Sequence, residues 1–120
     1  MFLLLAKMAD RTAMARLLDK KFNLISEIKN NDGDLLSMIN LILKKNQKTL
    51  KQIKSVIAVN DSGTFSGVRS VITIGNTLAF ALKIPVVPLS IKDINNKRKL
   101  EMAFRRKVNF AIPKYNKNLF

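Results

Sequence analysis

Residues 57–90 read IAVNDSGTFSGVRSVITIGNTLAFALKIPVVPLS, and this stretch decides the fold. It begins inside a β-branched run, 53–59, which predicts a buried strand. The uncharged periodic segment that follows predicts a long helix over 66–83, and the apolar run 85–89 predicts a second buried strand. A strand, a long helix and another strand in this order indicate an α/β protein.

The first half of the chain predicts three antiparallel strands followed by a helix. The strands fall at 2–7, 11–18 and 22–29, with turns at 8–10 and 19–21. In the third strand the alternation places Phe22 on the same face as Ile28. The turn at 31–34 ends in Asp34, a good N-cap for a helix over 34–45, so the element order is βββαβαβ.

The C-terminal quarter of the chain is polar and basic. Within residues 92–107, apolar anchors such as Leu100 and Phe104 predict a third helix. Pro113 ends any helix, and the tail 114–120 is expected to be extended. Because no segment has the composition of a linker, we expect one domain over 1–91, with the basic helix and the tail of 92–120 packed on it.

Histidine and cysteine are both absent from the 120 residues. Their absence removes the commonest general base, the usual zinc ligands and every Ser-His or Cys-His nucleophile. The eight acids are scattered, so we expect no catalytic residue, no metal site and no cofactor. The apolar opening 2–6 is shorter than a signal peptide's core of about 7–15 residues or a spanning helix of about 20. We therefore expect a cytoplasmic protein without membrane association.

Positive charge dominates the composition. Lys and Arg number 22 against eight acids, which gives a net charge of +14, and such a field attracts polyanions. A Lys- and Asn-rich chain with biased codon usage would have the same excess, because the charges are spread widely along the chain. Charge alone therefore leaves nucleic acid as one candidate partner.

The loop at 60–69 reads Asn-Asp-Ser-Gly-Thr-Phe-Ser-Gly-Val-Arg. With its surroundings it resembles the TsaB (YeaZ) family, which has Gly-Pro-Gly-Ser-Phe-Thr-Gly-x-Arg at this place, Leu-Ala late in the helix and Ile-Pro before the next strand. The residues in register are Gly63, Phe65, Gly67, Arg69, Leu78, Ala79, Ile84 and Pro85. Residues 112–118 also resemble the closing Pro-x-Tyr-x-Arg segment of that family, which implies that the family's second domain is missing between 89 and the tail.

This resemblance implies a fold and a role. The fold is an actin-like (ribonuclease H-like) ATPase domain, a five-stranded mixed sheet of order 3-2-1-4-5 with two helices on one face and a C-terminal helix. In that order both crossovers run in one direction, so right-handedness places both long helices on the same face. The implied role is a non-catalytic, pseudo-ATPase scaffold that pairs with a TsaD-like protein, or with a second copy, for threonylcarbamoyladenosine modification of tRNA.

The glycine loop is expected to cap the long helix. Its structural residues are Gly63, Thr64, Phe65, Ser66 and Gly67. The glycines permit positive φ, the hydroxyl groups bond exposed N–H groups, and Phe65 is expected to pin the loop to the core. The same loop suits a bound phosphate, but Asp61 adds a negative charge there. Related ATPases keep an Asp after the first strand, where this chain has Lys7 and Met8.

The long helices have unusually few charges, since 35–43 and 70–82 contain none. A helix that is apolar nearly all round must be covered on more than one side, which predicts a protein interface on the outer faces of the pair. The alternative is that both helices are simply buried against the sheet. Gly75 and Ala79, four residues apart, permit a close helix approach. The candidate partner-binding residues are Leu36, Ile39, Leu43, Arg69, Ile72, Thr73, Asn76 and Phe80.

The basic C-terminal segment offers a further candidate site. Its candidate tRNA contacts are Lys97, Arg98, Lys99, Arg105, Arg106 and Lys107, although a solvated helix face has the same pattern. Two other functions stay open from the sequence. One is a basic RNA-binding module that acts alone, and the other is a degenerate nucleotide-binding fragment of the same superfamily.

Overall fold

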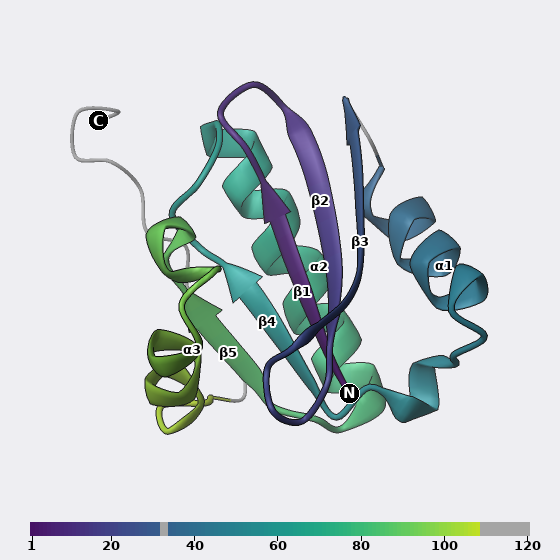
Figure 1. The fold of residues 1–120 in the computed structure, drawn as a ribbon. Coiled ribbons are helices and arrows are strands. Elements are labelled where there is room, and N and C mark those ends of the chain that lie inside the picture. Colours follow the sequence, from purple (N-terminus) through teal and green to yellow (C-terminus); the bar gives the residue numbers. More distant parts are fainter. Residues whose placement is uncertain (32–33, 109–120) are drawn as a thin grey trace.

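The computed structural model describes residues 1–31 and 34–108. Its five strands form one mixed sheet in the order β3-β2-β1-β4-β5, which confirms the predicted order (Figure 1). The first three strands are antiparallel, whereas β4 and β5 run parallel to β1. The strands are β1 (Phe2–Lys7), β2 (Thr12–Leu18), β3 (Leu24–Asn31), β4 (Ser55–Val59) and β5 (Val86–Leu89).

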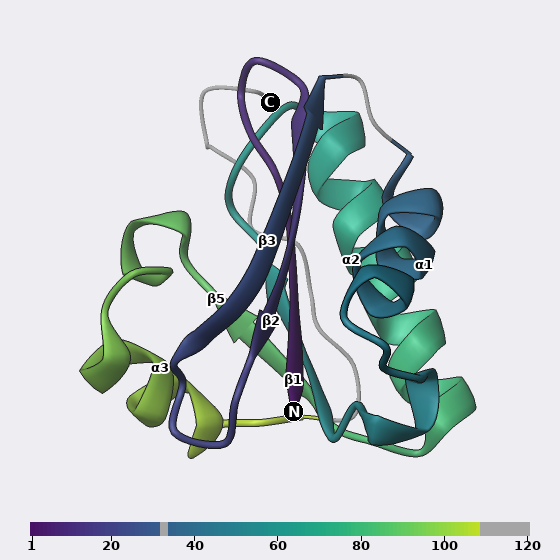
Figure 2. The same ribbon diagram turned by 45° about the vertical axis from the view of Figure 1, so that its right-hand side comes forward.

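The helices lie on both sides of this sheet. Figure 2 shows α1 (Leu35–Lys45) and α2 (Phe65–Leu82) side by side on one face and α3 (Lys97–Phe104) on the other. Short 3-10 turns, η1 (Leu50–Gln52) and η2 (Ile91–Asp93), precede β4 and α3. The shared face of α1 and α2 follows from right-handed crossovers that both progress in the same direction across the sheet.

Each long helix begins at the cap that the sequence predicts. The Asp34 carboxylate accepts a hydrogen bond from the Leu36 N–H (3.1 Å), and the Thr64 hydroxyl accepts one from the Gly67 N–H (3.1 Å). These bonds satisfy N–H groups that have no partner within the first helical turn. At the other end, α2 stops at Lys83, whose left-handed conformation (φ 57°) closes the helix.

Two hydrophobic clusters fill the core, one on each face of the sheet. Leu3 and Leu5 pack toward α1 and α2, while Leu4 and Ala6 pack toward α3. Because side chains alternate along a strand, a strand covered on both faces must be apolar throughout, as β1 is. The sheet therefore separates two layers of different composition.

One prediction about β3 is wrong. The sequence placed Phe22 in the strand on the face of Ile28, but Phe22 lies in the preceding turn with a φ of 66°, and the strand begins at Leu24. An irregularity in the β2–β3 pairing, beside Leu17 and Leu18, then shifts the register. Phe22 and Ile28 consequently pack in the clusters on opposite faces.

Helix α2 lies directly on the sheet. A β carbon at Gly75 would stand 3.4 Å from the Ala58 β carbon, so the close approach suggested by Gly75 is made to β4 rather than to another helix. In length and composition α2 is the one helix of the described residues that could cross a membrane, but one third of that window is buried. Helix α2 is apolar because one of its faces packs in the core.

The described chain ends against β5. The backbone of Val108 makes two hydrogen bonds with Val86, each 2.8 Å long, in an isolated antiparallel bridge. The predicted extended tail, 114–120, and the family-like segment 112–118 lie outside the described residues, as does part of the predicted turn at 31–34.

Candidate protein-protein interface

The glycine loop joins the end of β4 to α2 and packs on the end of β1. Gly63 has a φ of 95°, and a β carbon there would stand 2.5 Å from the Lys7 carbonyl oxygen. Gly67 lies in the first turn of α2, where the chain needs no positive φ. A side chain there would stand 3.2 Å from the Thr64 hydroxyl that caps the helix. The two glycines are therefore needed for different reasons. At Gly63 a side chain would both strain the backbone and clash with β1, whereas at Gly67 it would only crowd the Thr64 hydroxyl.

Asp61 turns away from the start of α2. Its carboxylate accepts hydrogen bonds from the Ser90 hydroxyl (2.6 Å) and the Ile91 N–H (2.8 Å). The Lys7 side chain instead lies beside the first turn of α2, with its Cδ 3.5 Å from a β carbon built on Gly67. The carboxylate of the loop thus links β4 to the segment that leads into α3.

Phe65 does not pin the loop to the core, contrary to expectation. It is the first residue of α2, and its ring is exposed at the surface. The Arg69 guanidinium lies over this ring, 5.7 Å from its centroid, one helical turn further on. The ring points outward because Val68, Val71 and Ile72 occupy the inward face of the helix.

Helix α1 packs one apolar stripe against the sheet, and its exposed face also contains apolar residues. Ile39 and Leu43, predicted at the interface, are 3% and 5% exposed because their 3–4-residue spacing places them on the sheet with Leu35, Met38 and Ile42. Leu36 is 57% exposed, as predicted for a surface contact. The sequence interpretation missed Leu41, which is 55% exposed beside Asn40. Its position opposite Ile39 and Leu43 on the helical wheel was the available signal.

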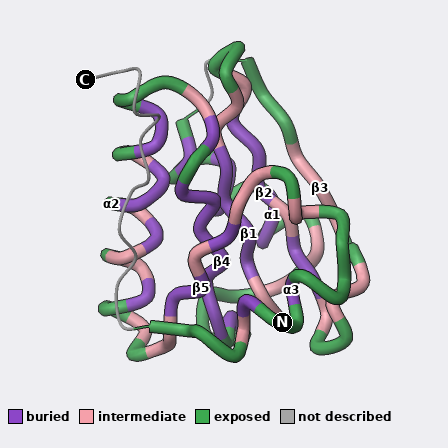
Figure 3. The backbone as a smooth tube through the Cα atoms, turned by 90° about the vertical axis from the view of Figure 1, so that its left-hand side faces the viewer, coloured by how far each residue is buried: buried purple, intermediate pink, exposed green. Residues whose placement is uncertain are grey.

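Helix α2 has the same division, and Figure 3 shows its buried side against the sheet and its exposed side away from it. Arg69, Thr73 and Phe80 point outward, and Phe80 is 85% exposed; Asn76 on the same side is partly buried. Ile72 is 6% exposed and belongs to the core. We define the outer helical face as eight of the exposed residues of the two helices: Leu36, Ser37, Asn40, Leu41, Arg69, Thr73, Thr77 and Phe80. Lys44 and Lys45, in the last turn of α1, are exposed as well and border this face.

The six candidate tRNA contacts lie in α3 and in the segment that follows it. Lys97, Arg98 and Lys99 begin α3, and Arg105, Arg106 and Lys107 follow it, each of them exposed. Lys97, Arg98 and Lys99 belong to α3, which packs on the layer opposite α1 and α2 (Figure 2), whereas residues 105–107 lead from α3 to the bridge between Val108 and Val86. The two sets of candidate residues therefore form two separate surfaces.

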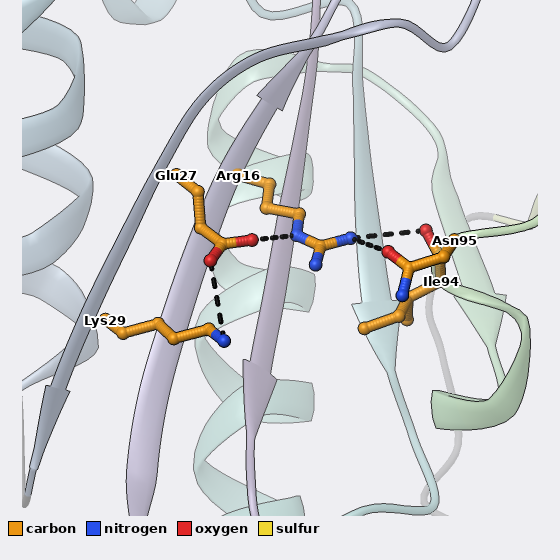
Figure 4. A network of polar contacts seen from close by, with 5 residues as sticks. All are labelled: Arg16, Glu27, Lys29, Ile94 and Asn95. Atoms are coloured by element: carbon orange, nitrogen blue, oxygen red, sulfur yellow. Dashed lines mark hydrogen bonds and ion pairs between the residues drawn. The ribbon is translucent and has the colours of Figure 1, made fainter.

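A polar network that the sequence interpretation missed holds the segment before α3. The Arg16 guanidinium donates to Glu27 Oε2 (2.6 Å), to the Asn95 side-chain oxygen (2.8 Å) and to the Ile94 carbonyl oxygen (3.3 Å), as Figure 4 shows. Arg16 is the charged residue inside the otherwise apolar strand β2, which was the available signal. The network ties β2, β3 and the entry to α3 together.

The described residues contain no cluster of three or more carboxylates or other ligand side chains that could hold a metal ion. A cavity of about 540 Å³ lies at the turn between β1 and β2 and is lined by Met8, Asp10, Thr12, Lys29, Asn30 and Asn31. The cavity contains none of the predicted site residues. The outer helical face is thus the best-formed candidate site on the α1–α2 side.

The sheet order, the parallel β1–β4–β5 half and the two helices on one face define an actin-like (ribonuclease H-like) domain. A family model described as TsaD, tRNA N6-adenosine threonylcarbamoyltransferase, matches residues 28–94, more than half of the chain. The chain is 36% identical over 74 residues to the tRNA threonylcarbamoyladenosine biosynthesis protein TsaB of Buchnera aphidicola subsp. Baizongia pistaciae. The chain therefore belongs to the TsaB (YeaZ) family, as its loop motif predicted.

Solved structures agree with this assignment. YeaZ from Pseudomonas aeruginosa superposes with a TM-score of 0.65 at 25% identity, over 74% of this chain and 44% of that one. A second structure, a protein with similarity to peptidase YeaZ from Pseudomonas aeruginosa, gives a TM-score of 0.62 at 26% identity, over 75% of this chain and 44% of that one. The match to the Buchnera protein covers 60% of this chain and 34% of that protein, so the chain spans less than half of these relatives.

Proposed function

We propose that this chain is a non-catalytic partner subunit that binds a TsaD-like protein through its outer helical face and so supports threonylcarbamoyladenosine modification of tRNA in the cytoplasm. The observation that carries the proposal is the exposure of Leu36, Leu41 and Phe80 on helices that carry almost no charge. Exposed apolar side chains grouped with uncharged polar ones are typical of the core of a protein interface.

The chemistry of the outer helical face favours another protein over a small ligand. Its side chains lie on two neighbouring helices rather than in a cavity. Arg69 is the one charged residue among them, and the exposed Lys44 and Lys45 border them at the end of α1. Helix pairs of this kind associate by packing side-chain ridges of one pair into the grooves of another. A TsaD-like partner agrees with the family model that this chain matches, and a second copy of the chain would present the same face.

A non-catalytic role is supported by the residues that the chain offers. The chain has no histidine or cysteine, and its glycine loop packs tightly on the Lys7 carbonyl. Asp61 is already hydrogen-bonded to Ser90 and the Ile91 N–H. In this proposal the chemistry belongs to the partner, and the loop serves to begin α2 correctly.

Co-purification tests the proposal. The chain would be co-expressed with the TsaD-like protein of its own organism, as wild type and as Phe80→Asp, and co-elution measured by size exclusion. Ile39 is unsuitable for this purpose, because a charge at that buried position would unfold the chain. Met102→Asp is the matched control, since Met102 is also an exposed apolar residue but lies on α3.

We expect the wild type and Met102→Asp to co-elute with the partner and Phe80→Asp to elute alone as a folded chain. Equal co-elution of all three proteins would contradict the placement of the interface. A folded wild-type chain that does not bind the TsaD-like protein at all would overturn the assignment of the partner.

A further inference from the structure

The α3 side of the molecule carries a basic surface built from two segments that are far apart in the sequence. Lys97 donates a hydrogen bond from its ammonium group to the Asn23 side-chain oxygen, so the β2–β3 turn lies against the start of α3. We define the basic face as the exposed cations of these segments: Lys20, Lys21, Lys97, Arg98, Lys99, Arg105, Arg106 and Lys107. The contact between Lys97 and Asn23 makes this one surface.

Two of the acids near the basic face, Asp19 and Glu27, are held by contacts within the fold. The Asp19 carboxylate accepts hydrogen bonds from the Lys21 N–H (2.8 Å), the Asn23 N–H (2.9 Å) and the Asn23 amide group (3.2 Å). Glu27 pairs with Arg16 and Lys29, the only cations of residues 1–31 and 34–108 that form salt bridges. Residues 97–107 hold six cations and one acid, Glu101, and residues 109–120 contain no acid. Most of the positive charge of the basic face is therefore not neutralised within the chain.

The structure also fixes the backbone of α3, which carries Lys97, Arg98 and Lys99. Leu100 and Ala103 of α3 are buried against the sheet, and the Phe104 ring lies 4.5 Å from that of Phe2 and 4.9 Å from that of Phe22. The Arg16 network fixes the entry to α3 (Figure 4). Arg98 and Arg105 are seven residues, or two helical turns, apart, which places them on one line about 10 Å long. Cations on a fixed helix lose less entropy on binding than cations on a mobile tail.

The chemistry of α3 favours RNA over a lipid surface. A helix that lies in a membrane needs a free apolar face, but Leu100, Ala103 and Phe104 face the sheet, and α3 exposes only Met102 among its large apolar residues. The Phe104 ring is packed against other rings, so the described part of the basic face has no aromatic platform on which unpaired bases would stack. Such a surface contacts phosphates of a folded RNA rather than bases of a single strand.

We propose that the basic face binds the phosphate backbone of folded tRNA while the outer helical face stays free for a protein partner. The identification of the RNA as tRNA rests on the proposed function, whereas the location of the surface rests on the charges and contacts of α3. Because α3 packs on the layer opposite α1 and α2, the proposal has both partners bound at the same time.

The test measures binding of the chain alone to an unmodified tRNA transcript over a series of salt concentrations. The double variant Arg98→Gln/Arg105→Gln removes two cations of the basic face, and Lys44→Gln/Lys45→Gln removes two from the last turn of α1 as a matched control. All four residues are exposed, and thermal unfolding checks that each variant folds. We expect the α3 variant to bind about tenfold more weakly at moderate salt, with a salt slope smaller by about two, and the control to bind within about twofold of wild type.

Three results would overturn the inference. One is an equal loss in both double variants, because the field of the whole chain would then explain binding. Another is binding of a single-stranded oligonucleotide of equal length as tight as that of tRNA. The third is equally tight binding to phosphatidylglycerol vesicles that the α3 variant also loses. Since no protein partner is present, a failure here leaves the proposed pairing with a TsaD-like protein untouched, and a failure of co-purification leaves this test intact.

Discussion

Gly63 is the residue at which the loop before α2 has least room. Its φ of 95° disfavours any other residue, and a β carbon would stand 2.5 Å from a backbone oxygen of β1. We expect Gly63→Ala to lower the free energy of unfolding by about 2–3 kcal/mol, because both the conformation and the contact are strained. Urea denaturation measures this change.

Gly75→Ala is the control for that prediction. Its β carbon would make ordinary contacts, 3.4 Å from Ala58 and 3.6 Å from Val56, and alanine favours a helix more than glycine does. We expect this variant to be as stable as wild type or slightly more stable. If both variants lost the same free energy of unfolding, the positive φ of Gly63 and its close contact with β1 would not explain the loss.

The lowered pKa of Asp19 predicts that the stability of the fold depends on pH. Hydrogen bonds from the Asn23 and Lys21 N–H groups hold the pKa of Asp19 below its ordinary value of 3.8. A carboxyl group whose pKa is lower in the folded state stabilises the fold above pH 3.8, and this stabilisation is lost as the pH falls through the folded-state pKa. Asp19→Asn should therefore be less stable than wild type at pH 6, and the difference should shrink as the pH falls below 3.8. Urea unfolding at each pH measures it, and a constant difference would contradict the prediction.

At the scale of elements, α3 depends on a polar anchor in a neighbouring strand. Arg16→Met would leave Glu27 with Lys29 alone and would free the Ile94 carbonyl and the Asn95 side chain. We expect a loss of about 1–3 kcal/mol in the free energy of unfolding and faster amide hydrogen exchange in α3 than in α1. Arg98→Met, at an exposed position on α3, should change stability by less than about 0.5 kcal/mol. Uniformly faster exchange in both helices of Arg16→Met would contradict this role.

Local signals predicted most elements well, and non-local contacts explain the errors. Asp34 and the periodicity after it predicted α1 to within one residue, since a cap and an apolar stripe are both local. The predicted start of β3 was wrong because Phe22 belongs to the turn that Asp19 stabilises. The irregular pairing of β2 with β3 beside Leu18 then places Phe22 on the opposite face of the sheet from Ile28. The Arg16 network joins residues 78 and 79 positions apart, a distance that no local pattern reveals.

The exposure of the candidate interface residues was predicted in part for the same reason. Of the candidate partner-binding residues, Leu36, Arg69, Thr73 and Phe80 are exposed on the two helices. When nearly every position of a helix is apolar, however, the composition no longer marks which stripe faces the sheet. Ile39, Leu43 and Ile72 were therefore placed on the surface although they fill the core, and Leu41 was overlooked.

At the scale of the whole molecule, the sheet separates two surfaces of opposite character. The α1–α2 side exposes Leu36, Leu41 and Phe80 with little charge, and the α3 side exposes a concentrated set of cations. This separation suits a small subunit that contacts a protein on one side and a polyanion on the other. The central claim is that the α1–α2 side is the protein-binding side.

The most direct test of that claim uses the absence of cysteine, which makes any introduced thiol unique. Thr73→Cys places a thiol on the outer helical face, and Met102→Cys places one on α3; both positions are exposed. The rate of maleimide labelling is measured for each variant, alone and with the purified TsaD-like protein. We predict that the partner slows labelling of Thr73→Cys by about tenfold or more and leaves Met102→Cys unchanged, because an interface core excludes water and reagents. Unchanged labelling of Thr73→Cys in a complex that has formed, or protection of Met102→Cys instead, would contradict the account.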